Sequence, residues 1–93
     1  MKAQAVFIVS GRVQGVFYRA SASEKATSLG LSGWVRNRRN GDVELFARGN
    51  PALLDELEAW LWEGPRMARV TSVKREESLE EAPDDAFRIR STR

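Results

Sequence analysis

The sequence predicts an α+β sandwich in which two helices lie on one face of an antiparallel sheet. Three observations indicate this class: an apolar, strand-like run near the N-terminus, two further strand-like runs separated by Asn40-Gly41, and a helix framed by Pro51 and Gly64. A chain of 93 residues can bury one two-layer core but not two. We therefore expect residues 1–93 to form one domain.

A glycine-rich junction separates the first expected strand from the first expected helix. Residues 3–10, AQAVFIVS, are apolar on both faces at their centre, which is typical of a central strand. Residues 18–29 carry small and apolar side chains at helical spacing, and Gly30 follows at a position where helices commonly end. The junction between these two elements, residues 11–19, reads GRVQGVFYR.

The middle of the chain predicts a hairpin. Residues 31–37 and 42–48 are the two strand-like runs, and the Asn40-Gly41 pair between them is a strong signal for a tight turn. Asn37 is then expected at the turn end of its strand.

Residues 50–64, NPALLDELEAWLWEG, predict the second helix. Asn50 is placed to cap the helix, and Pro51 takes the first helical position, where its missing N–H costs nothing. Three leucines form the apolar stripe of this helix: Leu54, Leu57 and Leu61.

The C-terminal third predicts the end of the sheet. Residues 68–76 are strand-like with an imperfect alternation that suggests a bulge, residues 77–85 form an acidic loop, and residues 87–90 form a short exposed edge strand. The order strand, helix, strand, strand, helix, strand is the ferredoxin-like βαββαβ pattern, with the last strand expected either whole or divided in two.

Composition excludes several kinds of chemistry. The chain has no histidine and no cysteine, so Ser-His-Asp catalysis, thiolate nucleophiles, zinc-thiolate sites and imidazole acid-base groups are all excluded. The net charge is +2, but residues 1–50 hold eight Lys/Arg against three Asp/Glu, whereas residues 51–93 hold seven against ten. The basic half favours an anionic ligand, although an ordinary solvated surface of mixed charge fits the same numbers.

The junction GRVQGVFYR suggests an anion site. Glycines let backbone N–H groups turn toward a bound oxyanion, and the N-terminus of a helix adds a favourable dipole. The amides expected to form this phosphate-binding loop are those of Gln14, Gly15, Val16, Phe17 and Tyr18. Arg19, in the first helical turn, would add a planar set of donors that suits phosphate. Glycines at such a junction are also common for purely structural reasons.

Asn37 is the second candidate. In a βαββαβ sheet the first and third strands are neighbours and the second pairs with the third, so the end of GWVRN can lie near the glycine loop. The carboxamide of Asn37 would then offer a donor and an acceptor that do not ionise. An asparagine ahead of RRNG also fits a turn-forming role.

These segments resemble the acylphosphatase family. GRVQGVFYR, then GWVRNRRNGDVEL, then GNPALLDELEAWLWEGPRMARVTSV follow the family's order and spacing, and the resemblance extends from about Ala5 to Ile89. It implies a ferredoxin-like α/β sandwich and a hydrolase that cleaves the carboxyl-phosphate bond of acyl phosphates. Tyr18 stands where phenylalanine is common in the family, and its hydroxyl therefore needs a partner.

The resemblance also implies the roles of the site residues. Arg19 would bind the phosphate together with the amides of residues 14–18, and Asn37 would hold and orient the attacking water. An acyl phosphate already has a good leaving group, so such a site needs no metal and no cofactor, and its partners are the small-molecule substrate and the product phosphate.

Two alternatives remain at this point. One is a non-catalytic module that binds an anion through the same loop. The other is an RNA-binding sheet that uses Trp34, Phe46 and the RNRR arginines, although the usual RNA-binding signature is missing.

The run AVFIV is too short for a membrane span and lacks the features of a signal peptide. We expect a cytoplasmic monomer without a membrane or nucleic-acid partner.

Overall fold

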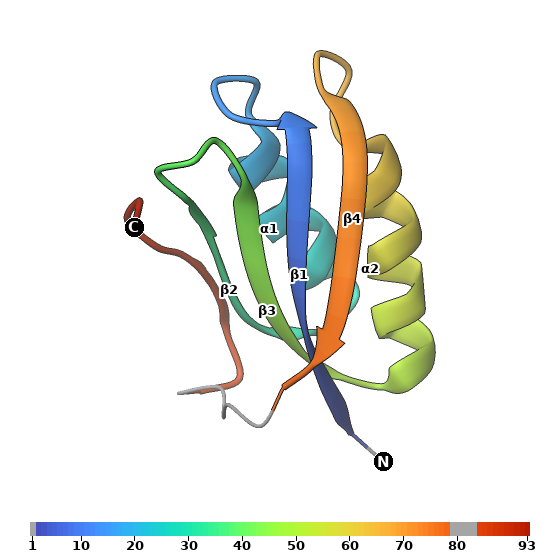
Figure 1. The fold of residues 1–93 in the computed structure, drawn as a ribbon. Helices are drawn as coiled ribbons and strands as arrows, with labels where there is room; N and C mark the ends of the chain where they lie inside the picture. Colours follow the sequence, from blue (N-terminus) through green and yellow to red (C-terminus); the bar gives the residue numbers. More distant parts are fainter. Residues whose placement is uncertain (1, 79–83) are drawn as a thin grey trace.

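Five strands and two helices make up the fold within residues 2–78 and 84–93, which the computed structural model describes. The strands are β1 (Ala3–Arg12), β2 (Ser32–Asn37), β3 (Val43–Gly49), β4 (Arg69–Glu77) and β5 (Phe87–Ile89), and the helices are α1 (Tyr18–Ser28) and α2 (Pro51–Glu63). The sheet has the order β4-β1-β3-β2-β5, and both helices cover the same face of it (Figure 1). The predicted ferredoxin-like α+β class is confirmed.

The sheet differs from the expected antiparallel one at β5, which pairs in parallel with β2. The reason lies in a row of paired residues that crosses the sheet: Glu77, Ala5, Ala47, Gly33 and Phe87. β4 therefore ends, and β5 begins, at the end of the sheet where β2 begins. A strand that is added to the free edge of β2 from this end must run in the same direction as β2.

The expected bulge lies where β4 pairs with the end of β1. Ser10 pairs with Ser72 and Gly11 pairs with Val70, so Thr71 is an extra residue on β4. Gly11 has φ of 122°, and a Cβ atom at that position would lie 2.1 Å from the carbonyl oxygen of Arg69. The glycine thus allows the two strands to approach closely just before the chain enters the glycine-rich loop.

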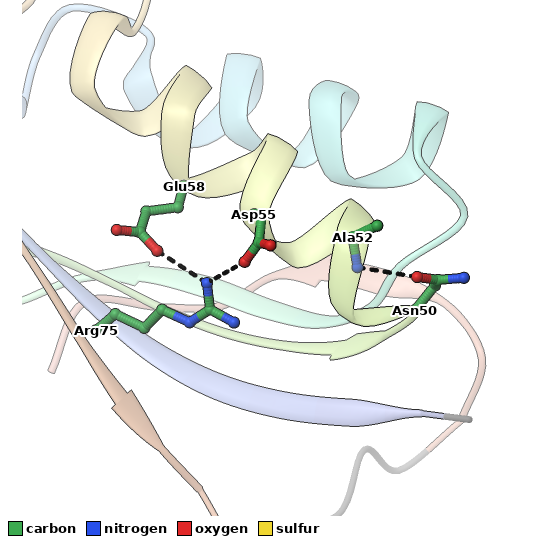
Figure 2. A network of polar contacts seen from close by, with 5 residues as sticks. All are labelled: Asn50, Ala52, Asp55, Glu58 and Arg75. Atoms are coloured by element: carbon green, nitrogen blue, oxygen red, sulfur yellow. Dashed lines mark hydrogen bonds and ion pairs between the residues drawn. The ribbon is translucent and has the colours of Figure 1, made fainter.

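The helix α2 begins and packs as its sequence predicts. The side chain of Asn50 accepts a hydrogen bond from the N–H of Ala52 at 2.9 Å, and the three leucines of the apolar stripe are fully buried. Figure 2 shows that Arg75 of β4 donates hydrogen bonds to both Asp55 and Glu58 of α2, at 2.7 and 2.9 Å. The hydrogen bonds to Glu58 and Asp55 raise the pKa of the Arg75 guanidinium. They fix α2 against the outer strand of the sheet.

Tyr18 joins the two helices. Its side chain is buried, and its hydroxyl donates a hydrogen bond of 2.6 Å to the carbonyl oxygen of Leu61 in the last turn of α2. In a longer helix this carbonyl would accept from residue 65, but Pro65 has no N–H. The partner that the Tyr18 hydroxyl needs is therefore a helix-end carbonyl, and the contact anchors the first turn of α1.

Replacing Tyr18 with phenylalanine is expected to lower the free energy of unfolding by about 1–2 kcal/mol, because the buried Leu61 carbonyl loses its donor. Burial also raises the pKa of the Tyr18 hydroxyl. Because ionisation of the Tyr18 hydroxyl opposes folding, its contribution to the free energy of unfolding is constant below about pH 10. This contribution is lost as the pH rises above that value. Urea unfolding followed by tryptophan fluorescence measures both effects. Equal stability of the two proteins at neutral pH would contradict this prediction.

Two further predictions from the sequence concern the acidic loop at residues 77–85 and the absence of a membrane span. The expected acidic loop falls largely on residues 79–83, which lie outside the described residues. Neither helix in the described part of the chain is long and apolar enough to cross a membrane.

Candidate active site

The β1–α1 junction and the β2–β3 turn lie at the same end of the sheet (Figure 1). Between them is a pocket of about 310 Å³. It is lined by Val13, Gly15, Phe17, Tyr18, Arg19 and Ala20 from the first segment, by Asn37 from the end of β2, and by Ile89 from β5. The structure thus brings Arg19 and Asn37, which are 18 positions apart in the sequence, into one pocket.

The loop at this pocket has an unusual backbone. Gly15 and Phe17 both have positive φ angles, 74° and 64°, and Phe17 is the only non-glycine residue with this property among the described residues. A left-handed non-glycine residue costs on the order of 1–3 kcal/mol and is commonly held in place at a binding site. In short loops, an alternation of right-handed and left-handed residues turns several backbone N–H groups toward one point, where an anion can bind.

Phe17 is also the residue that precedes the first turn of α1. It provides no side-chain hydrogen bond to that turn, and its ring is 82% exposed. The first N–H groups of a helix have no partner within the helix, so this end of α1 carries partial positive charge that favours an anion.

Arg19 adds a full positive charge at the same place. Its Nη1 donates a hydrogen bond of 3.3 Å to the carbonyl oxygen of Arg90, just beyond β5. The lining of the pocket contains no acidic residue, so nothing there neutralises the guanidinium. One end of the pocket is therefore positive and rich in donors, which suits a phosphoryl group.

Asn37 presents an unsatisfied acceptor. Its backbone is fixed, because its carbonyl oxygen accepts a hydrogen bond of 2.9 Å from the N–H of Arg93 and because it pairs with Val43 in the sheet. Its side-chain Oδ1 is buried and, alone among the buried side-chain polar atoms of the described residues, has no hydrogen-bond partner. Buried polar atoms are almost always satisfied, so this oxygen is an acceptor that a bound O–H or N–H can use.

Gln14 and Val16 do not line the pocket. Val16 is buried in the core, with 6% of its surface exposed. The side-chain Nε2 of Gln14 donates to the carbonyl oxygens of Arg38 and Asp42, at 2.7 and 2.8 Å. Gln14 therefore ties the glycine loop to the turn that directly follows Asn37.

This side-chain contact was missed by the sequence analysis, which considered only the Gln14 amide. The predicted strand order, in which the third strand pairs with both the first and the second, placed the two segments near each other, but no spacing pattern indicates which carbonyls a carboxamide will meet. The same holds for Ile89, which enters the pocket because β5 pairs with β2.

The chain is similar in sequence and in fold to known proteins. A family model described as Acylphosphatase matches residues 5–89. A protein of Xanthomonas euvesicatoria named acylphosphatase is 56% identical over 69 residues, which cover 74% of this chain and 78% of that protein. The structure of an acylphosphatase from Coxiella burnetii aligns with a TM-score of 0.88 at 47% identity, over 96% of this chain and 93% of the other.

An acylphosphatase from Bacillus subtilis aligns equally well, with a TM-score of 0.88 at 35% identity over 96% of this chain and 98% of the other. The family match includes the glycine loop, Arg19, Asn37 and Ile89. The chain belongs to the acylphosphatase family of hydrolases.

Proposed function

We propose that this protein hydrolyses acyl phosphates to a carboxylate and inorganic phosphate, by direct attack of a water that Asn37 orients on a phosphoryl group held by Arg19 and by the backbone amides of residues 14–18. The observation that supports the proposal most is that one pocket is lined both by Arg19, with no acidic residue in the lining, and by Asn37, whose buried Oδ1 has no hydrogen-bond partner.

The phosphoryl group would occupy the positive end of the pocket. Negative charge on its oxygens is stabilised there by the guanidinium of Arg19, by the loop amides and by the N-terminus of α1. These donors are held by the fold before substrate binds, so little reorganisation is required during the reaction. Holding the substrate in one orientation also removes part of the entropic barrier to attack by water.

The water would be placed by Asn37. Oδ1 accepts one of its protons as a hydrogen bond, which turns a lone pair of the water oxygen toward phosphorus. As the new P–O bond forms, the bond between phosphorus and the bridging oxygen breaks and the acyl group leaves as a carboxylate. We infer that the water proton passes to a phosphoryl oxygen of the substrate, because the lining offers no carboxylate and the chain has no histidine.

No metal or cofactor is part of this proposal. Within the described residues no group of three His, Cys, Asp or Glu side chains gathers as a set of metal ligands. The positive charge that faces the phosphoryl group would come from Arg19.

The test is hydrolysis of benzoyl phosphate, followed by the loss of its ultraviolet absorbance, in the presence of a strong chelator. We expect turnover that far exceeds the rate in buffer and that does not change when the chelator is added or divalent ions are restored. A folded protein that binds inorganic phosphate without turnover would contradict the proposal and support the anion-binding alternative. Turnover that requires an added metal would contradict its metal-independent part.

The RNA-binding alternative meets an obstacle on the other face of the sheet. Trp34 is 5% exposed, and the guanidinium groups of Arg36 and Arg90 lie over its ring at 4.5 and 5.0 Å. Phe46, whose ring centroid is 6.2 Å from that of Trp34, is fully buried. Arg36 is in turn paired with Glu44 at 2.8 Å. Neither ring is therefore exposed for the stacking of a base.

Replacing Gln14 with alanine is expected to lower kcat for benzoyl phosphate by about tenfold, because the loop and the turn after Asn37 lose both hydrogen bonds that align them. The matched control is Gln4→Ala, since Gln4 also donates from its side chain to a carbonyl, that of Ser78, at the opposite end of β1. Steady-state kinetics of both variants provide the measurement. Equal losses in the two variants would show that Gln14 affects only overall stability.

A further inference from the structure

Two large apolar side chains are exposed at the rim of the pocket. Among the described residues the exposed large hydrophobic side chains are Phe17, Trp62, Met67 and Ile89. Phe17 and Ile89, which are 82% and 51% exposed, both line the pocket that holds Arg19 and Asn37. The pocket therefore has a positive end and an apolar rim.

The position of Ile89 follows from the sheet. Ile89 is the register partner of Val35 in the parallel pair of β5 and β2, and neighbouring residues in such a pair point to the same face. Val35 is fully buried in the core beneath the helices. Ile89 therefore lies on the helix-covered face, but at the edge of the sheet, where it remains half exposed.

The same backbone segment contacts the positive end of the pocket. The N–H of Arg90 donates to the carbonyl oxygen of Val35 at 2.8 Å, and the carbonyl oxygen of Arg90 accepts from Arg19 at 3.3 Å. These two hydrogen bonds fix the residue after Ile89 between β2 and the guanidinium. The backbone directly after Ile89 is thus hydrogen-bonded both to β2 and to the guanidinium of Arg19.

A second hollow continues from this rim along α1. It has a volume of about 440 Å³ and is lined by Ala20, Ser23, Glu24, Thr27, Ser28 and Ile89. Ala20 and Ile89 also line the first pocket, so the two hollows adjoin at these residues. Of its lining residues, Ala20 follows Arg19 directly in the chain and Ile89 directly precedes Arg90, which Arg19 contacts. Its one charged side chain, Glu24, is negative and lies one helical turn farther along α1.

We propose that Phe17, Ala20 and Ile89 form the subsite for the acyl group and that this subsite favours uncharged, apolar acyl groups larger than acetyl. The inference rests on the proposed hydrolysis of acyl phosphates. In such a substrate one bridging oxygen joins phosphorus to the acyl carbon, so the acyl group must lie directly beside the phosphoryl group. With the phosphoryl group against Arg19, the apolar surface within reach is that of Phe17, Ala20 and Ile89.

The charge of the groove further restricts the class of acyl group that the subsite favours. An acyl group that carries a second anion would extend toward Glu24, where no lysine or arginine of the groove could pair with it. An apolar acyl group would instead cover surface of Ile89 that water now contacts, which is favourable in proportion to the area removed from water. A benzoyl group meets this description, whereas an acetyl group is too short to cover the same surface.

The experiment compares kcat/KM for benzoyl phosphate with kcat/KM for acetyl phosphate in the wild type and in Ile89→Ser, Ile89→Val and Met67→Ser. Met67 is the matched control, because it is also an exposed apolar residue, 58% exposed, but lines neither hollow. In Ile89→Ser we expect the benzoyl/acetyl ratio to fall by about tenfold, mainly through KM, since apolar contact stabilises bound substrate and transition state alike. Ile89→Val, which keeps an apolar side chain, and Met67→Ser should retain the wild-type ratio.

Other results would overturn either the subsite or the proposed function. An unchanged ratio in Ile89→Ser would overturn the subsite, and so would an equal loss on both substrates, because Ile89 would then act only through folding or through Arg19. If Ile89→Ser fails to fold, Ile89→Ala and Ile89→Phe take its place. The benzoyl/acetyl ratio should then fall in Ile89→Ala and should not fall in Ile89→Phe, and an unchanged ratio in Ile89→Ala would overturn the subsite. Failure of the wild type to hydrolyse either substrate would instead overturn the proposed function itself.

Discussion

Replacing Arg19 with glutamine is expected to lower kcat/KM for benzoyl phosphate by at least about 10³-fold. Glutamine keeps much of the length and polarity of arginine but removes the positive charge and the forked donors. The pocket lining contains no other cation, so no neighbouring side chain can replace this charge when negative charge builds on the phosphoryl oxygens. Inorganic phosphate should also lose affinity, which can be measured as the loss of competitive product inhibition.

Two further variants separate the loss of the Arg19 donors in the pocket from a general loss of positive charge. Arg12→Gln removes the same charge from the exposed end of β1, outside the pocket lining, and should leave turnover nearly unchanged. Arg19→Lys keeps the charge but loses the planar fork, so we expect activity between that of the wild type and that of Arg19→Gln. Comparable losses in Arg12→Gln and Arg19→Gln would indicate that only long-range attraction of the substrate had been removed. That effect would disappear at high salt.

Replacing Asn37 with alanine is expected to lower kcat by about 10²- to 10³-fold, because one preorganised group that positions the attacking water is lost. Phosphate binding should persist, since Arg19 and the loop remain. The stability of the variant is the more unusual expectation. Oδ1 of Asn37 is buried without a partner, so its removal should leave the free energy of unfolding unchanged or raise it by about 1 kcal/mol.

The control for Asn37 is Asn40→Ala in the adjacent turn. Oδ1 of Asn40 accepts a hydrogen bond of 3.0 Å from the N–H of Asp42, so alanine at this position should weaken the turn while activity is retained. Kinetics, phosphate inhibition and urea unfolding of both variants together test the assignment. A marked loss of stability in Asn37→Ala would contradict a role in which this side chain serves the ligand and not the fold.

The elements that the sequence predicted well are those with local causes. Asn50 and Pro51 mark the start of α2 because capping and the fixed φ of proline act within one turn, and the stripe of leucines is set by helical period alone. The Asn40-Gly41 turn is similarly local, and Gly41 has φ of 99°. By contrast, the parallel pairing of β5 depends on which sheet edge is free after four strands have assembled. No short window of sequence contains that information.

The same distinction applies to the site. The glycine pattern and Arg19 are adjacent in the chain, and the strand order that brings Asn37 to them follows from the predicted topology. The left-handed conformation of Phe17, the two carbonyls that Gln14 contacts and the unpaired Oδ1 of Asn37 result from tertiary packing. These features require coordinates, because side-chain partners across a sheet depend on register and on distances of a few ångströms.

The strand order has a consequence for how quickly the protein reaches its native state. β1 is the first strand in the chain, yet its two neighbours are β3 and β4, so that Ala5 must find Glu77 before the sheet is complete. Closing such long loops is costly in chain entropy, and proteins with many distant pairings fold on the order of milliseconds to seconds, not microseconds. The pocket needs residues from both the first loop and β5. Regain of turnover during refolding should therefore coincide with the slow formation of the sheet and should not precede it.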